Sequence, residues 1–266
     1  MSNKTLPIGI FDSGVGGLTV VAEVIKELPL EDVVYFGDIA RTPYGSKSKE
    51  TVIKFSREIT HFLVDQGAKL IIIACNTASS VALDLLKGEF DRPIIGVIQA
   101  GVSTALQVTR NNRVGVIGTS TTIVSGSYVN ELKRLNPNLT VISQACPLFV
   151  PLVEEGWVNH KVTTLVAEEY LSPLKDNKID TLILGCTHYP FLKPIIQKVL
   201  GEGVVLVNSA TEMARITRKT LKEEGLLREE NSDVTYKFYL SDTSANFIKL
   251  GERLLGEKMR VITQRM

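Results

Sequence analysis

Short, continuous runs of apolar residues alternate with longer stretches in which apolar residues recur at helical spacing. The apolar runs span residues 8–11, 33–36, 70–74, 94–98, 113–118, 140–143, 181–185 and 204–207. Runs of this length predict strands that are buried on both faces, as in parallel sheets. The stretches between them, such as 18–28 and 49–67, predict amphipathic helices. The alternation therefore predicts an α/β fold of mostly parallel sheets flanked by helices.

Two pairs of similar segments recur at nearly the same spacing along the chain. IGIFDSGVGG, which begins at residue 8, is answered by VGVIGTSTT at residue 114, and ACNTAS around Cys75 is answered by GCTHYP around Cys186. An internal echo of this kind predicts two pseudo-symmetric α/β domains with an active site in the cleft between them. We expect residues 98–207 to form the second domain. Residues 1–97 and 208–266 would form a discontinuous first domain, since the last stretch predicts only two helices and a strand.

Charge and composition exclude several classes of partner. The 266 residues include 30 Lys and Arg against 29 Asp and Glu, scattered along the chain. No basic stripe of the kind that binds a phosphate backbone is present, so we expect no nucleic-acid partner. No apolar run approaches the roughly 20 residues needed to span a bilayer. The N-terminal segment lacks a signal-peptide core, and we expect a cytoplasmic protein with no membrane attachment.

Polar residues follow most of the predicted strands. In parallel sheets, ligands bind at the carboxyl ends of the strands, where loops and helix N-termini converge. The residues at these positions are Asp12, Ser13, Asp38, Cys75, Asn76 and Thr77 in the first unit, and Thr119, Cys186, Thr187 and His188 in the second. A small-molecule site at these strand ends is therefore expected.

The glycine-rich segment DSGVGG has two interpretations. It resembles a dinucleotide-binding loop, but Thr19 stands where that fingerprint requires its third glycine. A turn that lets strand and helix pack closely explains the glycines at least as well. A non-enzymatic module that binds a nucleotide or another metabolite stays open as an alternative.

The three cysteines differ in their sequence context. Cys75 and Cys186 each stand at a predicted strand end just before a predicted helix start, where amide N–H groups and the helix dipole stabilise a thiolate. Cys146 has no such counterpart, precedes Pro147 and is interpreted as a small buried hydrophobe. A thiol-redox protein is a further alternative, but it requires the two thiols to lie within disulfide reach.

His188, two residues after Cys186, allows a Cys/His hydrolase as one interpretation and a structural histidine as the other. No pair of Cys or His residues has the spacing of a zinc site, and we expect no metal.

Two thiols on opposite sides of a ligand suit the inversion of a stereocentre. One thiolate removes a proton from one face of a carbon acid while the opposing thiol delivers a proton to the other face. A free thiol has a pKa near 8.5, so the base needs its pKa lowered, for which helix N-termini or an imidazolium are candidates. Asp12 and Glu154 could take or orient a thiol proton. Both could instead be capping or solvated residues, an interpretation that suits Glu154, which adjoins Glu155, better than Asp12 at a strand end.

Taken together, these segments resemble the glutamate racemases of the cofactor-independent aspartate/glutamate racemase superfamily. The resemblance runs in order through FDSGVGGLTV, YFGDIARTPYGSKS, ACNTAS, VGVIGTSTT, CPLFVPLVEEG and LGCTHYPFLKP. It implies a racemase that interconverts L- and D-glutamate without pyridoxal phosphate, any other cofactor or a metal, and that supplies D-glutamate for peptidoglycan.

The resemblance also implies the roles of individual residues. Cys75 and Cys186 would be the two acid/base residues, with Asp12 assisting the first, and Glu154 and His188 assisting the second. The residues implied to line the substrate pocket are Asp12, Ser13, Tyr44, Gly45, Asn76, Thr77, Thr187 and His188. A racemase for another amino acid, notably aspartate, stays open because it depends on pocket depth. The oligomeric state is also open, with a homodimer among the options.

Overall fold

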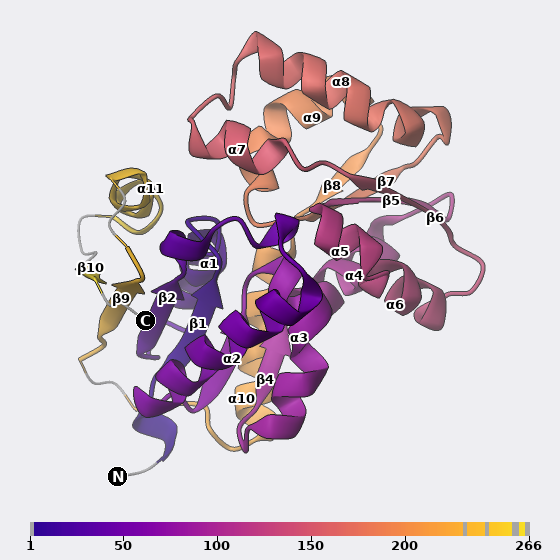
Figure 1. Ribbon diagram of the computed structural model, residues 1–266. Coiled ribbons are helices and arrows are strands. Elements are labelled where there is room, and N and C mark those ends of the chain that lie inside the picture. The colour runs from indigo at the N-terminus through magenta and orange to yellow at the C-terminus, as the bar shows by residue number, and fades with distance from the viewer. Residues whose placement is uncertain (1–2, 231–232, 243–244, 257–260, 264–266) are drawn as a thin grey trace.

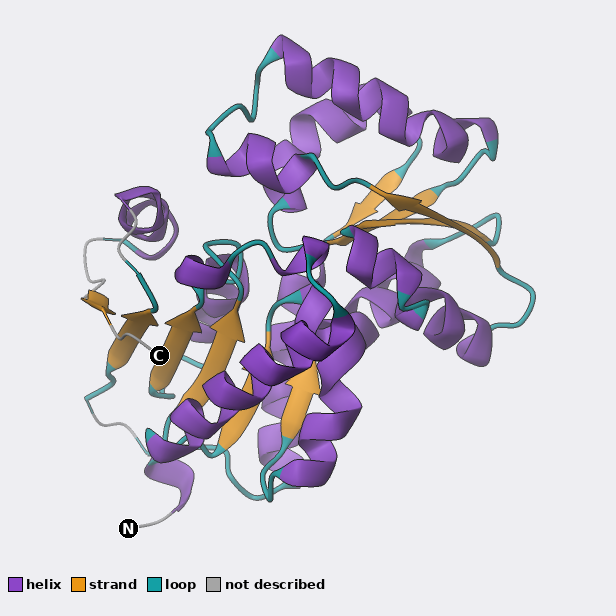
Figure 2. Cartoon of the chain, viewed as in Figure 1, coloured by secondary structure: helices purple, strands orange, loops and turns teal. Residues whose placement is uncertain are grey.

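The computed structural model describes residues 3–230, 233–242, 245–256 and 261–263. These residues form two parallel β-sheets, each with helices on both faces (Figures 1 and 2). The predicted α/β class is confirmed. In the described part of the chain, no helix is both long enough and apolar enough to cross a membrane.

The larger sheet has the strand order β10-β9-β2-β1-β3-β4. Its strands are β1 (Ile8–Asp12), β2 (Val33–Gly37), β3 (Leu70–Ile73), β4 (Ile94–Gly96), β9 (Tyr236–Leu240) and β10 (Val261–Thr263). All the pairings are parallel, so the carboxyl ends of β1 and β3 lie side by side at one edge.

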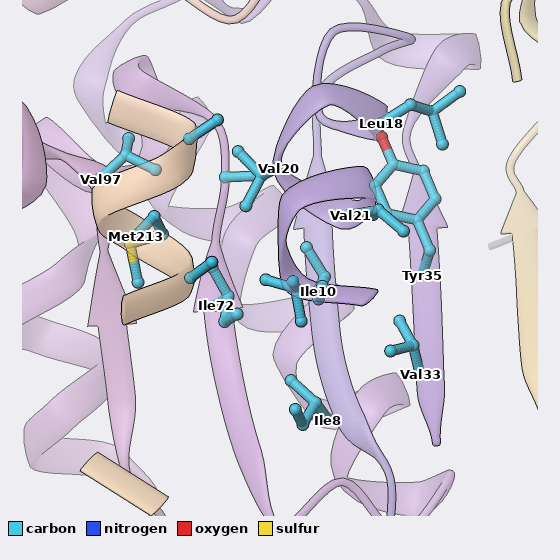
Figure 3. Packing of buried hydrophobic residues seen from close by; sticks show 14 of the residues in the cluster. Ile8, Ile10, Leu18, Val20, Val21, Val33, Tyr35, Ile72, Val97 and Met213 are labelled. Atoms are coloured by element: carbon cyan, nitrogen blue, oxygen red, sulfur yellow. The ribbon is translucent and has the colours of Figure 1, made fainter. Parts of the chain in front are cut away.

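Alternate residues of the central strands face two separate cores. Ile8 and Ile10 of β1 join Ile72 of β3 in one core, which also includes Val21 and Met213 (Figure 3). Residues that alternate with them pack into the core on the other face of the sheet, namely Phe11, Ile71 and Ile73. Successive side chains of a strand point to opposite faces, so a strand buried on both faces is apolar throughout. This explains the continuous apolar runs in the sequence.

The smaller sheet has the strand order β6-β5-β7-β8. Its strands are β5 (Arg113–Gly118), β6 (Thr140–Ala145), β7 (Thr181–Gly185) and β8 (Val205–Val207). Leu182 and Leu184 of β7 pack into the core beneath α8 and α9, whereas Ile183 packs into the core beneath α4 and α6.

Helices surround both sheets. The α-helices are α1 (Leu18–Glu27), α2 (Lys49–Asp65), α3 (Asn76–Glu89), α4 (Val97–Val108), α5 (Ser120–Val124), α6 (Ser127–Leu135), α7 (Phe149–Glu154), α8 (Lys161–Asp176), α9 (Lys193–Leu200), α10 (Ser209–Glu223) and α11 (Ala245–Leu255). Four short 3₁₀ helices are described: η1 (Asn3–Thr5), η2 (Ile39–Arg41), η3 (Tyr44–Ser46) and η4 (Tyr189–Leu192).

A strand was predicted over residues 94–98, but only the first part of this segment is a strand. Strand β4 ends at Gly96, and α4 begins at Val97. Periodicity does not distinguish a short apolar run that is all strand from one that passes into a buried helix. A Cβ on Gly96 would lie 2.9 Å from Ser79 Oγ, so the glycine lets this strand end pack closely against α3. The short strand β10 was not predicted either.

The segment after residue 208 returns to the larger sheet. Strand β9 pairs with β2 along its whole length, and α10 packs against both α1 and α4. Helix α4 itself contacts β7 and β8 of the smaller sheet. The division at residues 97 and 207 stays a prediction.

Candidate active site

The two predicted cysteine loops lie at the carboxyl ends of β3 and β7. Cys75 caps the N-terminus of α3, and its Sγ accepts the N–H of Ala78 at 3.4 Å. Cys186 follows β7 directly but is succeeded by a turn and by η4, with α9 beginning only at Lys193. The expectation of a helix start just after each cysteine is correct for Cys75 and wrong for Cys186. The helix dipole is therefore available to one thiol only.

Both cysteines line one small cavity of about 10 Å³. The lining residues come from elements of both sheets: Ser13, Pro43, Tyr44, Gly45, Cys75, Asn76, Thr77, Thr119, Val150, Cys186, Thr187 and His188. Most of the residues predicted from the sequence for the pocket are among them. The exception is Asp12, which is fully buried outside the lining. Glu154, predicted as a catalytic residue, also lies outside the lining and is partly exposed on a neighbouring pocket.

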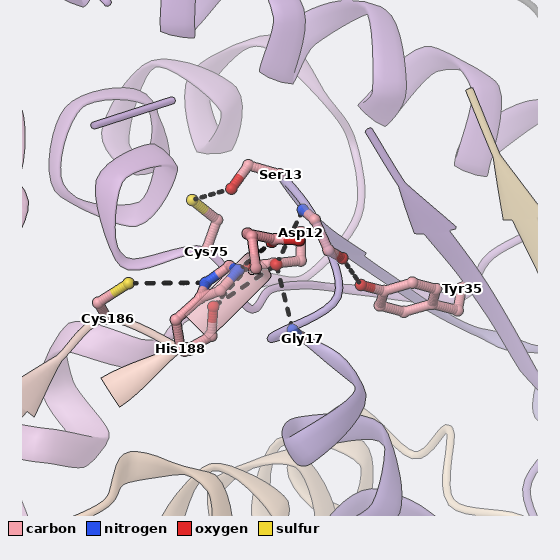
Figure 4. A network of polar contacts seen from close by, with 10 residues as sticks. Asp12, Ser13, Gly17, Tyr35, Cys75, Cys186 and His188 are labelled. Atoms are coloured by element: carbon pink, nitrogen blue, oxygen red, sulfur yellow. Dashed lines mark hydrogen bonds and ion pairs between the residues drawn. The ribbon is translucent and has the colours of Figure 1, made fainter. Parts of the chain in front are cut away.

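Asp12 is fully buried and closes the glycine-rich loop on itself. Its Oδ2 accepts the backbone N–H of Gly17 at 3.1 Å (Figure 4) and that of Gly14 at 3.0 Å. Thr187 Oγ1 donates to Oδ1 at 3.3 Å. Burial raises the pKa of Asp12, while the charge of His188 and these hydrogen bonds lower it. Asp12 therefore connects the first loop to the residue that follows Cys186, rather than hydrogen-bonding Cys75.

The same contacts bear on the nucleotide interpretation of this loop. Two N–H groups that a phosphate would need are occupied by Asp12, and a Cβ on Gly17 would lie 2.4 Å from Asp12 Cβ. This geometry favours the packing role of the glycines.

His188 and Glu154 form a chain of contacts that begins at Cys186. Cys186 Sγ lies 3.8 Å from His188 Nδ1, and His188 Nε2 lies 2.6 Å from Glu154 Oε1. Burial alone would lower the pKa of His188, but the interactions with Cys186 and Glu154 outweigh it and raise the pKa to about 10. An imidazolium therefore faces Cys186 at neutral pH.

Cys75 has the opposite electrostatic environment. Its thiol donates to Ser13 Oγ at 3.6 Å. Burial and the nearby Asp12 carboxylate raise the pKa of Cys75 to about 12, which outweighs the lowering by the Ala78 N–H and Ser13. At neutral pH, Cys75 is a protonated thiol. The cavity thus combines a thiol held as an acid with a thiol whose neighbour is a cation.

Two lining residues, Pro43 and Val150, were not predicted, and Thr119 was predicted at a strand end but was not assigned to the substrate pocket. The sequence pointed to Thr119 because it directly follows β5, just as Ser13 directly follows β1. Pro43 adjoins the predicted Tyr44, whereas nothing in the local sequence distinguishes Val150.

Cys146, the third cysteine, is buried and packs with Phe149 and Tyr189 outside the cavity lining. Within the described residues, no three His, Cys, Asp or Glu side chains lie together as a metal site would require.

Comparisons with known proteins agree on one family. The family model for Asp/Glu/hydantoin racemases matches residues 14–217. A glutamate racemase from Geobacter metallireducens is 52% identical over 257 residues, which cover 97% of this chain and 95% of that protein. The crystal structure of a glutamate racemase isoform from Bacillus anthracis has a TM-score of 0.94 and 40% identity, covering 99% of this chain and 98% of that one. A glutamate racemase from Francisella tularensis in complex with D-glutamate has a TM-score of 0.91 and 43% identity, with coverage of 99% and 98%.

Proposed function

Because the chain belongs to the Asp/Glu/hydantoin racemase family, and to the glutamate racemases within it, we propose that it interconverts L- and D-glutamate by a two-cysteine proton transfer. The observation that carries this proposal is the presence of Cys75 and Cys186 in one cavity. The two cysteines come from corresponding strand ends of separate sheets. A ligand held between them presents a different face to each.

In one direction, Cys186 is the base. Its thiolate, stabilised by the His188 imidazolium, takes the α-proton, so the Cα–H bond breaks and an S–H bond forms. Cys75 then gives its thiol proton to the opposite face of the carbon and becomes a thiolate. In the reverse direction the roles exchange, and each cysteine acts as acid or base according to the enantiomer bound.

Neutral hydrogen-bond donors in the cavity lining bind the substrate carboxylates. Ser13, Asn76, Thr77 and Thr187 supply hydroxyl or amide groups at the lining. Hydrogen bonds to a charged acceptor are stronger than those between neutral groups. Asp12 and Glu154 do not line the cavity and act through residues that do. Asp12 holds the loop that carries Thr187. Glu154 stabilises the positive charge on His188.

The cavity is too small for glutamate as it stands. A volume of about 10 Å³ is close to the minimum that holds one water molecule. We therefore propose that the units 1–97 with 208–266, and 98–207, separate to admit substrate and close over it. Closure would expel water and strengthen the electrostatic stabilisation of the carbanionic transition state.

The names of the relatives support the choice of substrate and the use of the product. The relatives compared above are named for glutamate, and one of the solved structures holds D-glutamate. We assign glutamate as the substrate, peptidoglycan synthesis as the use of the D-isomer, and the cytoplasm as its location, where the three unpaired cysteines would stay reduced.

Incubation with L-glutamate in deuterated water tests the proposal. We expect the circular dichroism of the amino acid to decay to zero while mass spectrometry detects one deuterium at the α-carbon. L-Aspartate is the control and should react far more slowly. An L-glutamate sample that keeps its rotation and its α-proton would refute the proposal, and faster exchange of aspartate would reassign the substrate.

A further inference from the structure

Tyr128 joins the two halves of the molecule directly beneath the cavity. It belongs to α6, on the smaller sheet, and its side chain is almost fully buried. Its hydroxyl donates to Oδ1 of Asn76 at 2.6 Å. Asn76 is the first residue of α3 and follows Cys75 immediately. The hydrogen bond therefore runs from a helix of the second unit to the loop of the first cysteine.

Glycine residues fix the position of the Tyr128 ring. A Cβ on Gly185 would lie 3.1 Å from Tyr128 Cε2, and a Cβ on Gly101 would lie 3.2 Å from Cε1. The ring thus packs closely on the backbone of Gly185, the residue that precedes Cys186. Tyr128 therefore contacts both Gly185, which precedes Cys186, and Asn76, which follows Cys75.

The hydrogen bond also determines how the Asn76 amide is presented. Because Oδ1 accepts from Tyr128, the amide nitrogen is directed away from the tyrosine hydroxyl. Asn76 lines the cavity. A carboxylate accepts hydrogen bonds from an amide N–H and is repelled by an amide oxygen. Binding of an anionic substrate therefore depends on which end of this amide faces the cavity.

We propose that Tyr128 is a positioning residue, which holds the Asn76 amide with its N–H group toward a substrate carboxylate and keeps the two cysteine loops in register. The assignment rests on the proposed racemase function. Without the hydroxyl, the amide has no fixed orientation, and the substrate must orient it on binding. We therefore expect both L-glutamate and D-glutamate to bind more weakly when the hydroxyl is absent.

The test uses Tyr128→Phe, which removes the hydroxyl and keeps the ring. We expect KM for L- and D-glutamate to rise about tenfold, the effect of losing one hydrogen bond that orients a charged ligand. We expect kcat to change less, since the carboxylate is bound in ground and transition states alike. Asn76→Ala should raise KM at least as much.

A double-mutant cycle separates this role from a purely structural one. If Tyr128 acts through Asn76, then Tyr128→Phe in the Asn76→Ala background should raise KM no further. If Tyr128 only supports the fold, the two losses should multiply. Tyr239→Phe is the matched control, because Tyr239 donates to the Gln66 side-chain amide at 3.0 Å away from the cavity lining. It should leave KM unchanged.

The outcomes distinguish this assignment from the proposed function. An inactive wild type would overturn both. With an active wild type, an unchanged KM in Tyr128→Phe, or multiplying losses in the cycle, would overturn the assignment alone. Asn76→Ala supplies a test that does not require the Phe variant to fold, since an unchanged KM there would equally refute the role given to the amide.

Discussion

At the scale of single residues, the two cysteines of the cavity differ in their neighbours. Cys75 has a hydroxyl, a helix N-terminus and a nearby carboxylate, whereas Cys186 has an imidazole connected to Glu154. Burial and the Asp12 charge raise the pKa of Cys75 to about 12. The proposed two-thiol mechanism needs one thiol and one thiolate in each free form of the enzyme, and these unequal neighbours favour one of the two arrangements.

Replacement of either cysteine tests the acid/base roles. We expect Cys75→Ser and Cys186→Ser each to slow racemisation by at least about a hundredfold, the lower end for a positioned acid/base group. The reason is that an alcohol is a far weaker acid than a thiol. Racemisation followed by circular dichroism gives the rates. Cys146→Ser is the control and should stay active. Full activity in a Cys75 or Cys186 variant would exclude the two-thiol mechanism.

The pH dependence tests the Glu154–His188 pair. The interactions with Cys186 and Glu154 raise the pKa of His188 to about 10, so the imidazolium persists below that pH and is lost above it. We expect kcat/KM to fall above about pH 10 in the wild type. Glu154→Gln removes a charge that favours the imidazolium, so the alkaline limb should move to lower pH by about one unit or more.

Glu155→Gln provides the matched control, because it removes the same charge from the next residue, which is exposed. Its alkaline limb should coincide with that of the wild type. If the Glu154 variant also kept the wild-type limb, the His188 imidazolium would not govern activity.

At the scale of elements, glycine residues let loops of the two units approach closely. A Cβ on Gly16 would lie 2.6 Å from Thr187 Cβ and 2.7 Å from the Thr187 carbonyl carbon. A Cβ on Gly45 would lie 2.3 Å from Thr119 Cβ. The glycine-rich motif therefore acts here by close packing between the loops after β1 and β7, and a methyl group would displace the loop that carries Cys186.

Gly16→Ala tests this packing. Because the backbone of Thr187 must shift, we expect kcat/KM to fall by about a hundredfold, the effect of a displacement of about 1 Å at a catalytic group. Steady-state kinetics and thermal melting separate loss of activity from loss of fold. Gly88→Ala in α3 is the control, since no atom lies within 4 Å of the added Cβ. It should keep full activity and gain up to about 1 kcal/mol of stability. Equal activity of the two variants would contradict the packing role of Gly16.

At the scale of the whole molecule, hydrogen bonds beside the cavity join elements around the larger sheet to elements around the smaller sheet. Thr121 Oγ1 lies 3.0 Å from the carbonyl oxygens of both Gly45 and Lys47, and Ser127 Oγ donates to the Ser80 carbonyl at 2.8 Å. With a cavity of about 10 Å³, these contacts describe a closed arrangement. Entry of substrate must open it, and bound substrate should hold it shut.

Hydrogen exchange tests this opening. We expect saturating glutamate to slow amide exchange in η3 and α5, since a ligand that binds the closed form suppresses opening. Mass spectrometry of peptides covering these segments gives the rates. Exchange in α8, on the outer face of the smaller sheet, should not change. Identical rates in η3 and α5 with and without glutamate would contradict a closing motion of the two units.

The order of most strands and helices, and the membership of the family, could be predicted from the sequence alone. Periodicity is a local property, and strands buried on both faces require continuous apolar runs, so β1, β3, β5 and β7 were visible without coordinates. The polar residues at their carboxyl ends were visible for the same reason. The boundary at Gly96 was not, because a short apolar run suits a buried strand and a buried helix equally.

Which of these residues contact one another could not be predicted from the sequence and depends on the packing of the folded chain. The contact of Asp12 with Thr187 and that of Tyr128 with Asn76 join residues far apart in the chain. The two loops around the cysteines are similar in sequence, yet only Cys75 caps a helix. The pKa values of Cys75 and His188 depend on burial and on neighbours brought together by packing. No local pattern encodes such contacts, because they arise from how two sheets and their helices are placed against each other.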